Sequence, residues 1–271
     1  MKNQNLFLII FLSFNLFSEI HEKNTIKAVH DHVYVEIKES ESKNIIDSSS
    51  TIVVLDLDNT TFKPKNSHHG GDAWFSASIN HLQKEHELDF ANALSLVLPE
   101  YINIQKESAV EPVEKEIVEF ISKFQKDKIP VIALTARSMP LEETTLKQLK
   151  SINIDFSHNC LAGKKDITFH NLEHSCKYTN GILFVSDNDK GKALTVFLDH
   201  VKHGPKKVVY ADDKLKHAQH VERACQAKNI EAVCIRYGLL DEEVKNYKLP
   251  EETKTKLSGK VKKDKSKVSG K

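Results

Sequence analysis

The sequence predicts an α/β fold built around a parallel sheet. Short apolar, β-branched runs that end in polar residues recur along the chain, as buried parallel strands do when both faces of their sheet are covered. Amphipathic helical stretches separate these runs, which is the alternation expected of parallel strands and crossover helices. With 271 residues, the chain is long enough for one sizeable domain that carries an insertion.

The strands are expected in chain order wherever an apolar run ends in polar residues. The segments are TIVVLDLD (51–58), IPVIALTAR (129–137), GILFVSDND (181–189), KKVVYADDK (206–214) and IEAVCIRYG (230–238). Folds of this class bind ligands at the carboxyl ends of their strands. The polar residues that follow each run are therefore the first candidates for chemistry.

Helices are expected between these strands, where apolar residues recur every three to four positions. The segments are 113–125, 141–149, 192–201 and 215–228. A further stretch, at about 63–112, separates the first strand from the next helix and reads as mainly helical. Its length predicts a helical insertion into a core that spans residues 51–250.

The N-terminal part of the chain differs from this core. Residues 1–18 contain a basic start and an apolar run from Leu6 to Phe17, which is typical of a signal peptide and short for a membrane span. This predicts export to the periplasm or beyond, with an uncleaved membrane anchor as the alternative. Residues 19–50 form an N-terminal extension in which VYVEI (33–37) alternates like a strand.

The C-terminal segment, 251–271, is rich in lysine and lacks apolar periodicity, which predicts a disordered tail. The formal net charge of the whole chain is +1, so bulk charge gives no case for a nucleic-acid partner. No membrane contact is expected beyond the N-terminal segment. Of the four cysteines, Cys160 and Cys176 flank a polar loop and are the candidate disulfide pair if the chain is exported.

Two carboxylates follow the first strand, at Asp56 and Asp58. Close carboxylates repel each other unless a cation or a shared proton relieves them, and Mg²⁺ suits an oxygen-rich site that also holds phosphate. One carboxylate can attack phosphorus to form an aspartyl phosphate, while the other protonates the leaving oxygen. The pattern therefore points to phosphoryl chemistry.

The later strand ends add groups that fit the same chemistry. They supply a hydroxyl, a guanidinium, a lysine at a helix start and further carboxylates, in the order Thr135, Arg137, Lys190 or Lys192, Asp212 and Asp213. A hydroxyl and cations bind phosphate oxygens, whereas carboxylates bind the metal.

Taken together, these residues resemble the four motifs of the haloacid-dehalogenase-like (HAD) superfamily. The matches in motif order are Asp56, Asp58 and Thr60; Thr135; Lys190 in a KGxxL context; and Asp212 with Asp213. The resemblance covers roughly residues 51–237. It implies a Rossmann-like, three-layer α/β/α sandwich, and it implies that the insertion at 63–112 is a cap that limits access to the site.

The resemblance also implies roles in a phosphatase. Asp56 is the expected nucleophile and Mg²⁺ ligand, and Asp58 is the expected general acid and base, with its backbone carbonyl on the metal. Thr135 is expected to bind phosphoryl oxygens. Lys190 is expected to screen the repulsion between Asp56 and phosphate.

The fourth motif and three further residues complete the expected site. Asp212 would complete the metal site, and Asp213 would bind the metal through water or orient Lys190. Asn59 and Arg137 are candidates for contact with the substrate. Trp74 either walls the active site or anchors the cap.

The implied function is Mg²⁺-dependent hydrolysis of a phosphomonoester, either a phosphorylated small molecule or a phosphoprotein. A phosphotransferase would differ only in the acceptor that clears phospho-Asp56. The rival interpretation is a non-catalytic, exported interaction protein on the same scaffold. The segment GGDAWF (70–75) resembles an uncharacterised bacterial branch of the superfamily whose members are often exported.

Overall fold

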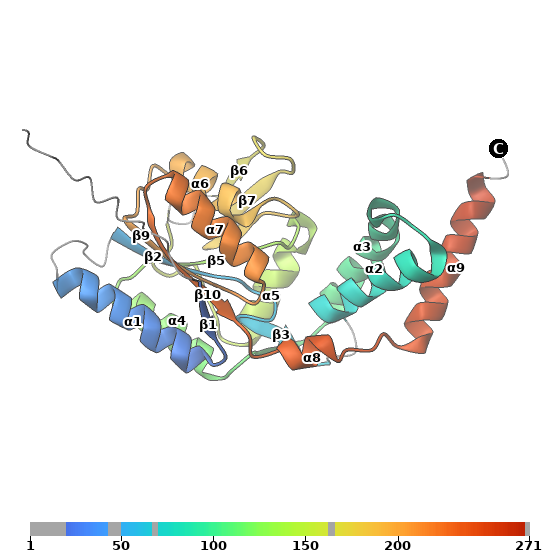
Figure 1. Cartoon of the computed structure of the whole chain (residues 1–271), viewed down its shortest axis with the longest axis horizontal. Helices are drawn as coiled ribbons and strands as arrows, with labels where there is room; N and C mark the ends of the chain where they lie inside the picture. Colours follow the sequence, from blue (N-terminus) through green and yellow to red (C-terminus); the bar gives the residue numbers. More distant parts are fainter. Residues whose placement is uncertain (1–19, 43–49, 67–69, 162–165, 269–271) are drawn as a thin grey trace, which may run out of the picture.

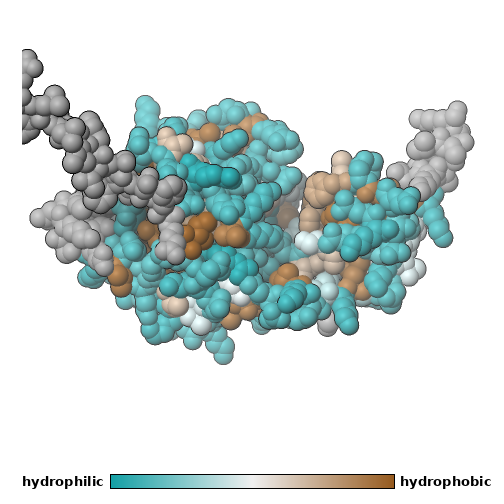
Figure 2. All heavy atoms as spheres, viewed as in Figure 1, coloured by the Kyte–Doolittle hydropathy of each residue, from teal (hydrophilic) through white to brown (hydrophobic). Residues whose placement is uncertain are grey.

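The structure, a computed structural model, describes residues 20–42, 50–66, 70–161 and 166–268. The expected signal segment lies outside these residues. The described chain consists of an α/β core joined to a smaller helical cap (Figure 1). Figure 2 shows that hydrophilic residues cover most of the visible face. None of the described helices is both long and apolar enough to cross a membrane.

Eight of the described strands form the core sheet, in the order β1-β10-β9-β2-β5-β8-β7-β6. Their bounds are β1 His21–Lys23, β2 Thr51–Leu55, β5 Val131–Thr135, β6 Ile167–Phe169, β7 Cys176–Thr179, β8 Ile182–Phe184, β9 Lys207–Asp212 and β10 Glu231–Tyr237. The strands from β1 to β8 in this order are parallel, and β7 and β6 continue the sheet in antiparallel fashion. All five segments expected to be strands lie in this sheet.

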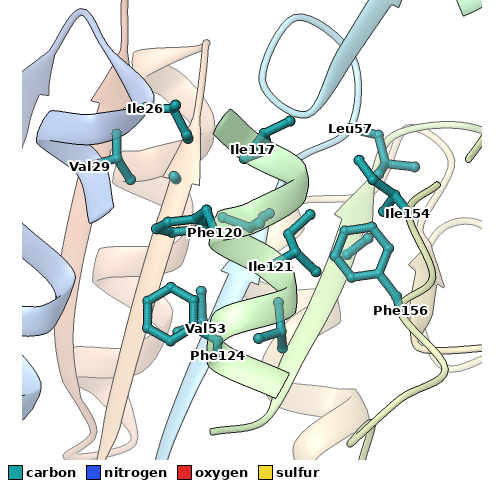
Figure 3. Close-up of a cluster of buried hydrophobic side chains, with 14 of the residues drawn as sticks. Ile26, Val29, Val53, Leu57, Ile117, Phe120, Ile121, Phe124, Ile154 and Phe156 are labelled. Carbon is teal, nitrogen blue, oxygen red and sulfur yellow. The ribbon is translucent and has the colours of Figure 1, made fainter. Parts of the chain in front are cut away.

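Helices cover both faces of the sheet, so the core is a three-layer α/β/α sandwich, as expected. One face carries α1 (Ile26–Ser42), α4 (Glu116–Lys126) and α5 (Glu142–Ser151), and the other carries α6 (Lys190–His200) and α7 (Leu215–Ala227). Strand β2 serves both layers, because Val53 packs on the first face and Val54 on the second. Figure 3 shows the first layer, where Phe120 and Phe124 lie against Val53.

The expected strand at 33–37 is wrong, because this segment lies within helix α1. The buried residues of α1 are Ile26, Val29, Val33 and Ile37, which recur every three to four positions. Val35, which a strand would have placed beside Val33 and Ile37, is 52% exposed. The helical spacing of the buried residues extends across residues 33–37, and this segment is therefore helical despite its short alternation of apolar and polar residues.

The cap interrupts a small hairpin that follows β2. Strand β3 (Phe62–Pro64) pairs antiparallel with β4 (Val110–Pro112). Between them lie helices α2 (Asp72–His86) and α3 (Phe90–Glu107), which pack on each other around Trp74, Leu82 and Val97. The two helices leave the core and return to it through this one stem.

The expectation of a disordered tail is wrong for residues 251–268, which form helix α9 (Glu251–Val268). Leu257 and Val261 of this helix are buried in the apolar cluster of the cap. Lys256 and Lys260 both pair with Glu100 on α3. The chain reaches the cap by way of the short helix α8 (Asp241–Lys245), and Figure 1 shows α9 beside α2 and α3.

The four cysteines are free thiols, so the expected Cys160–Cys176 pair is not formed. Cys176 is buried in β7, where its side chain belongs to the apolar cluster between the sheet and α6. Burial also raises the pKa of Cys176 to about 11, which keeps the thiol protonated.

Candidate active site

The candidate site lies where strand order reverses in the middle of the sheet. Strand β2 has β9 on one side and β5 on the other, so the chain leaves β2 in one direction and later returns on its far side. Asp56, Asp212 and Thr135 therefore come together at three neighbouring strand ends. All three side chains are buried.

A tight turn follows Asp56. The backbone N–H groups of Thr61 and Phe62 both donate to the Leu57 carbonyl, at 2.9 and 3.0 Å. Asn59 takes a left-handed backbone conformation (φ 62°), which asparagine tolerates better than most residues. The Thr61 hydroxyl donates to the Asp56 carbonyl at 2.6 Å. This turn returns the chain at once into the hairpin stem of the cap.

Three carboxylates meet at the strand ends. Oxygens of Asp56, Asp212 and Asp213 all lie within 4.8 Å of one another. Burial and the Asp212 charge raise the pKa of Asp56 to about 8, and burial with the same charge raises the pKa of Asp213. Such a cluster is under electrostatic stress as it stands. An all-oxygen donor set of this kind fits a hard divalent cation such as Mg²⁺.

Lys190 places one positive charge against these carboxylates. Its Nζ donates to Asp56 Oδ1 at 2.5 Å and to Asp212 Oδ2 at 2.7 Å, and the residue is 1% exposed. Burial lowers the pKa of the Lys190 ammonium, but the two carboxylates outweigh burial and raise it. Lys192 is exposed, and its backbone N–H donates to the side chain of the N-cap residue Asp189. The structure therefore brings Lys190, and not Lys192, to the cluster.

Further groups, which the sequence analysis did not single out, surround Asp212. The Tyr210 hydroxyl donates to Asp212 Oδ2, and His217 Nδ1 lies 3.1 Å from the same oxygen. The Lys214 backbone N–H donates to Asp212 Oδ1 at 2.7 Å. Burial acts to raise the pKa of Asp212, but Lys190 and His217 outweigh it and hold the pKa below its usual range. The contact between Tyr210 and Asp212 could have been predicted, because alternate residues of a strand share a face and these two are two positions apart in β9.

Asp58 is held by Arg137. The Nε and Nη2 atoms of Arg137 donate to the two oxygens of Asp58, each at 2.8 Å. Burial acts to raise the pKa of Asp58, but Arg137 outweighs it and keeps the pKa below its usual range. Arg137 was expected either to contact phosphate or to lie at the surface near a helix N-cap; it is 5% exposed, and neither alternative anticipated Asp58 as its partner. The Thr135 hydroxyl oxygen accepts from the Arg137 backbone N–H at 3.1 Å.

The remaining candidates lie in different places. Asn59 is in the site, where its Nδ2 donates to Asp213 Oδ2 at 3.3 Å. Trp74 is 1% exposed among the apolar residues of the cap, and its ring stacks on Tyr101 at 6.5 Å between centroids. Trp74 therefore lies in the apolar interior of the cap, as the anchoring alternative expects.

Cap and core meet beside the site. Asp72, the first residue of α2, forms an ion pair with Lys214, which directly follows Asp213. A cavity of about 30 Å³ lies beside this pair, lined among others by Asn59, Asp72 and Val244. This volume holds about one water molecule.

Residues 23–261 match the family described as "Protein of unknown function (DUF2608)". The chain belongs to the DUF2608 family. Relatives of this DUF2608 chain include proteins named "Putative outer membrane protein" in three chlamydiae. The Chlamydia pneumoniae relative is 30% identical over 198 residues, which is 71% of each chain. The Chlamydia trachomatis relative is 27% identical over 234 residues, covering 85% of this chain and 83% of its own.

Two solved structures are similar to the DUF2608 chain at low identity. A haloacid dehalogenase-like family hydrolase from Streptococcus pneumoniae has a TM-score of 0.43 and 11% identity, over 74% of this chain and 99% of its own. A class C acid phosphatase from Bacillus anthracis has a TM-score of 0.41 and 13% identity, over 86% and 87%. With both scores below 0.5, these likenesses add nothing to what the site geometry shows.

Proposed function

We propose that this DUF2608 protein is an Mg²⁺-dependent phosphomonoester hydrolase that acts through phosphorylated Asp56. One observation carries the proposal. Lys190 Nζ lies 2.5 Å from Asp56 Oδ1 inside a group of three carboxylates, two of them buried and one half-buried, at the strand ends where this fold class binds ligands. A buried lysine beside a carboxylate nucleophile supplies the positive charge that an incoming phosphoryl group requires.

The carboxylates favour a resident Mg²⁺. Asp56, Asp212 and Asp213 would hold the ion together with the backbone carbonyl of Asp58. The raised pKa values of Asp56 and Asp213 show that their negative charges are destabilised, and a bound cation would relieve this. When bound, Mg²⁺ would neutralise charge on the phosphoryl oxygens.

The residues of the chain account for the remaining steps. An oxygen of Asp56 attacks phosphorus, and the bond from phosphorus to the ester oxygen breaks as Asp58, which has first left Arg137 and taken a proton from water, gives that oxygen the proton. Asp58 then takes a proton from water, which attacks phosphorus and releases Asp56. Lys190 stabilises the negative charge in both steps, and Thr135 binds a phosphoryl oxygen.

Two features support a small phosphorylated molecule as the substrate. Asp72, the first residue of α2, pairs with Lys214 beside the strand ends, and the cavity next to this pair is about 30 Å³. A folded phosphoprotein would need a far wider opening. We also propose that the protein is exported, since residues 1–18 read as a signal peptide and its chlamydial relatives carry names that place them at the outer membrane.

The direct test is hydrolysis of 4-nitrophenyl phosphate by the full chain, with Mg²⁺ or with EDTA. Wild type is expected to turn over only with Mg²⁺, and Asp56→Asn is expected to lose roughly 10⁶-fold in kcat, as removal of a nucleophile does in other enzymes. Asp199→Asn, a carboxylate 62% exposed on α6, is the matched control and should keep full activity.

Persistent turnover in Asp56→Asn would contradict the proposed nucleophile. A well-folded wild type that neither binds Mg²⁺ nor hydrolyses aryl and alkyl phosphates would favour the non-catalytic scaffold. Transfer of phosphate to an added alcohol, in preference to water, would identify a phosphotransferase.

A further inference from the structure

Gln105 joins the two ends of the cap insertion. It lies in the last turn of α3 and is fully buried. Its Nε2 donates to the carbonyl of Gly70, the residue at which the described cap segment begins. Gly70 has a φ of 84°, and a Cβ there would lie 2.5 Å from Ile104 Cγ2, so the chain passes close against α3 at this point. One side chain thus holds the entry and exit segments of the cap together.

The same side chain contacts the core through Arg137. Gln105 Oε1 accepts from Arg137 Nη2 at 3.0 Å. Arg137 Nη1 in turn donates to two residues of core helix α5, to Gln148 Oε1 at 2.6 Å and Thr145 Oγ1 at 3.0 Å. Gln148 Nε2 completes the network by donating to the backbone carbonyls of Gln105 and Ser108, each at 3.1 Å.

Arg137 is therefore shared between the cap and the candidate acid–base residue. Its Nη2 donates to Gln105 at the C-terminal end of α3, and its Nη1 donates to helix α5. Its Nε and Nη2 donate to the two oxygens of Asp58. The guanidinium is planar and rigid, so a shift of its cap-facing edge also shifts the edge that holds Asp58. Because each oxygen of Asp58 accepts from the guanidinium, the orientation of the carboxylate is set by Arg137.

We propose that cap helix α3 controls the position of Asp58 through Gln105 and Arg137, so that cap movement and the release of Asp58 are one coupled step. Gln105 and Arg137 are positioning residues in this scheme. Entry of substrate displaces the cap, the guanidinium follows Gln105, and an oxygen of Asp58 becomes free. The catalytic consequence rests on the proposed hydrolase function, whereas the coupling between cap and Asp58 does not.

The coupling is tested without catalysis by hydrogen exchange in the full chain. Coupling is reciprocal, so loss of the Asp58 charge must loosen the C-terminal end of α3. Asp58→Asn is expected to speed amide exchange at residues 101–108 by roughly 5-fold or more. Asp213→Asn removes a carboxylate of the same site that is not bound to Arg137, and it is expected to leave these amides unchanged.

Equal exchange at residues 101–108 in wild type and Asp58→Asn would overturn the proposal. So would equal acceleration in Asp58→Asn and Asp213→Asn, because the effect would then follow from charge in the site in general. Arg137→Lys, which keeps the charge and loses the two-pronged contact, should behave as Asp58→Asn does.

The catalytic consequence is tested with two leaving groups. A 4-nitrophenolate leaves readily without a proton, whereas a primary alkoxide needs one, so misplacement of Asp58 harms alkyl phosphates selectively. Gln105→Leu is expected to lower kcat/KM for the alkyl phosphate at least about tenfold more than for 4-nitrophenyl phosphate. Gln105→Glu, which keeps an acceptor for Arg137, should recover part of this difference.

Val97→Ala is the matched control, since Val97 is buried on the same helix and belongs to the apolar cluster of the cap. It should lower kcat/KM for both substrates to the same extent. Equal losses in Gln105→Leu would assign Gln105 a merely structural role and overturn the positioning scheme. Absence of wild-type turnover on either substrate would instead count against the hydrolase, and hydrogen exchange would still decide the coupling.

Discussion

Lys190 brings one positive charge to a cluster of two buried carboxylates and one half-buried carboxylate, so the cluster without a cation keeps excess negative charge. Burial of charge is unfavourable unless it is compensated, and the raised pKa of Asp56 is the response. Proton binding and Mg²⁺ binding are thus alternative ways to relieve the same repulsion. The affinity for Mg²⁺ should therefore rise with pH, and Mg²⁺ binding should release protons.

This competition predicts how stability depends on pH in EDTA. Unfolded Asp56 loses its proton near pH 4, whereas folded Asp56 keeps its proton up to about pH 8. Folding takes up a proton within this window, so the free energy of unfolding falls as pH rises. We expect wild type to lose about 2 kcal/mol more than Asp56→Asn between pH 5 and pH 7, measured by urea unfolding. Parallel pH profiles of the two proteins would contradict this.

The two lysines at the start of α6 predict a sharp contrast. Lys190→Met leaves Asp56 and Asp212 without their shared cation, and it is expected to abolish turnover of 4-nitrophenyl phosphate. Lys192→Met changes an exposed side chain two residues away and is expected to keep full activity. Steady-state kinetics of the two variants decide the matter, with circular dichroism to show that both are folded. Equal losses would mean that Lys190 has no special role.

The individual residues of the cluster were predictable, because each follows an apolar strand and strand ends converge in this fold class. The partner of Arg137 was not. Asp58 and Arg137 are 79 positions apart, and nothing in the local pattern distinguishes a guanidinium that binds a carboxylate from one that binds phosphate. Tyr210 and His217 were missed for a similar reason, since their importance depends on contact with Asp212.

At the scale of elements, α1 shows how a short pattern can mislead. The alternation at 33–37 spans less than two turns of a helix, whereas Ile26, Val29, Val33 and Ile37 continue one face over three turns. The five core strands, by contrast, were correctly predicted because uninterrupted β-branched runs are too short and too apolar for surface helices. Longer windows therefore distinguish the two periods.

A pair of valines tests the helical assignment of α1. Val33 is 1% exposed, and its replacement by alanine should lower the free energy of unfolding by about 2 kcal/mol through lost burial and a cavity. Val35, at 52% exposed, should change it by less than about 0.5 kcal/mol. Chemical denaturation of both variants provides the comparison. Similar losses at the two positions would favour a strand, where both residues share a face.

At the scale of the whole molecule, the cap is assembled from two distant parts of the sequence. Helices α2 and α3 come from the insertion after β2, and α9 comes from the chain that follows β10. The sequence alone could not predict this association, because α9 offers few apolar residues, and their partners lie more than 150 positions earlier in the chain. Ion pairs to Glu100 add to the contact but leave no local periodic signal.

The role of α9 can be tested at Leu257, which is 1% exposed. Leu257→Ala should destabilise the cap by about 2–5 kcal/mol, as such substitutions do in buried clusters. Trp74 is the only tryptophan and lies in the same cluster, so its fluorescence reports on the cap. We expect the fluorescence transition in urea to move to lower concentration than the circular dichroism transition. Lys262→Ala, at an exposed position, is the control. Coincident transitions in Leu257→Ala would show that cap and core unfold as one unit.

The late position of α9 has a consequence for the newly made chain. A ribosome releases residues in order, so the last strand of the sheet, β10 (Glu231–Tyr237), emerges before residues 251–268. The strand ends that carry Asp56, Thr135 and Asp212 can therefore come together while α2 and α3 still lack their third helix. A nonsense mutation between these two points would yield a protein that keeps every described strand of the sheet and helices α2 and α3 but lacks the helix that packs against them.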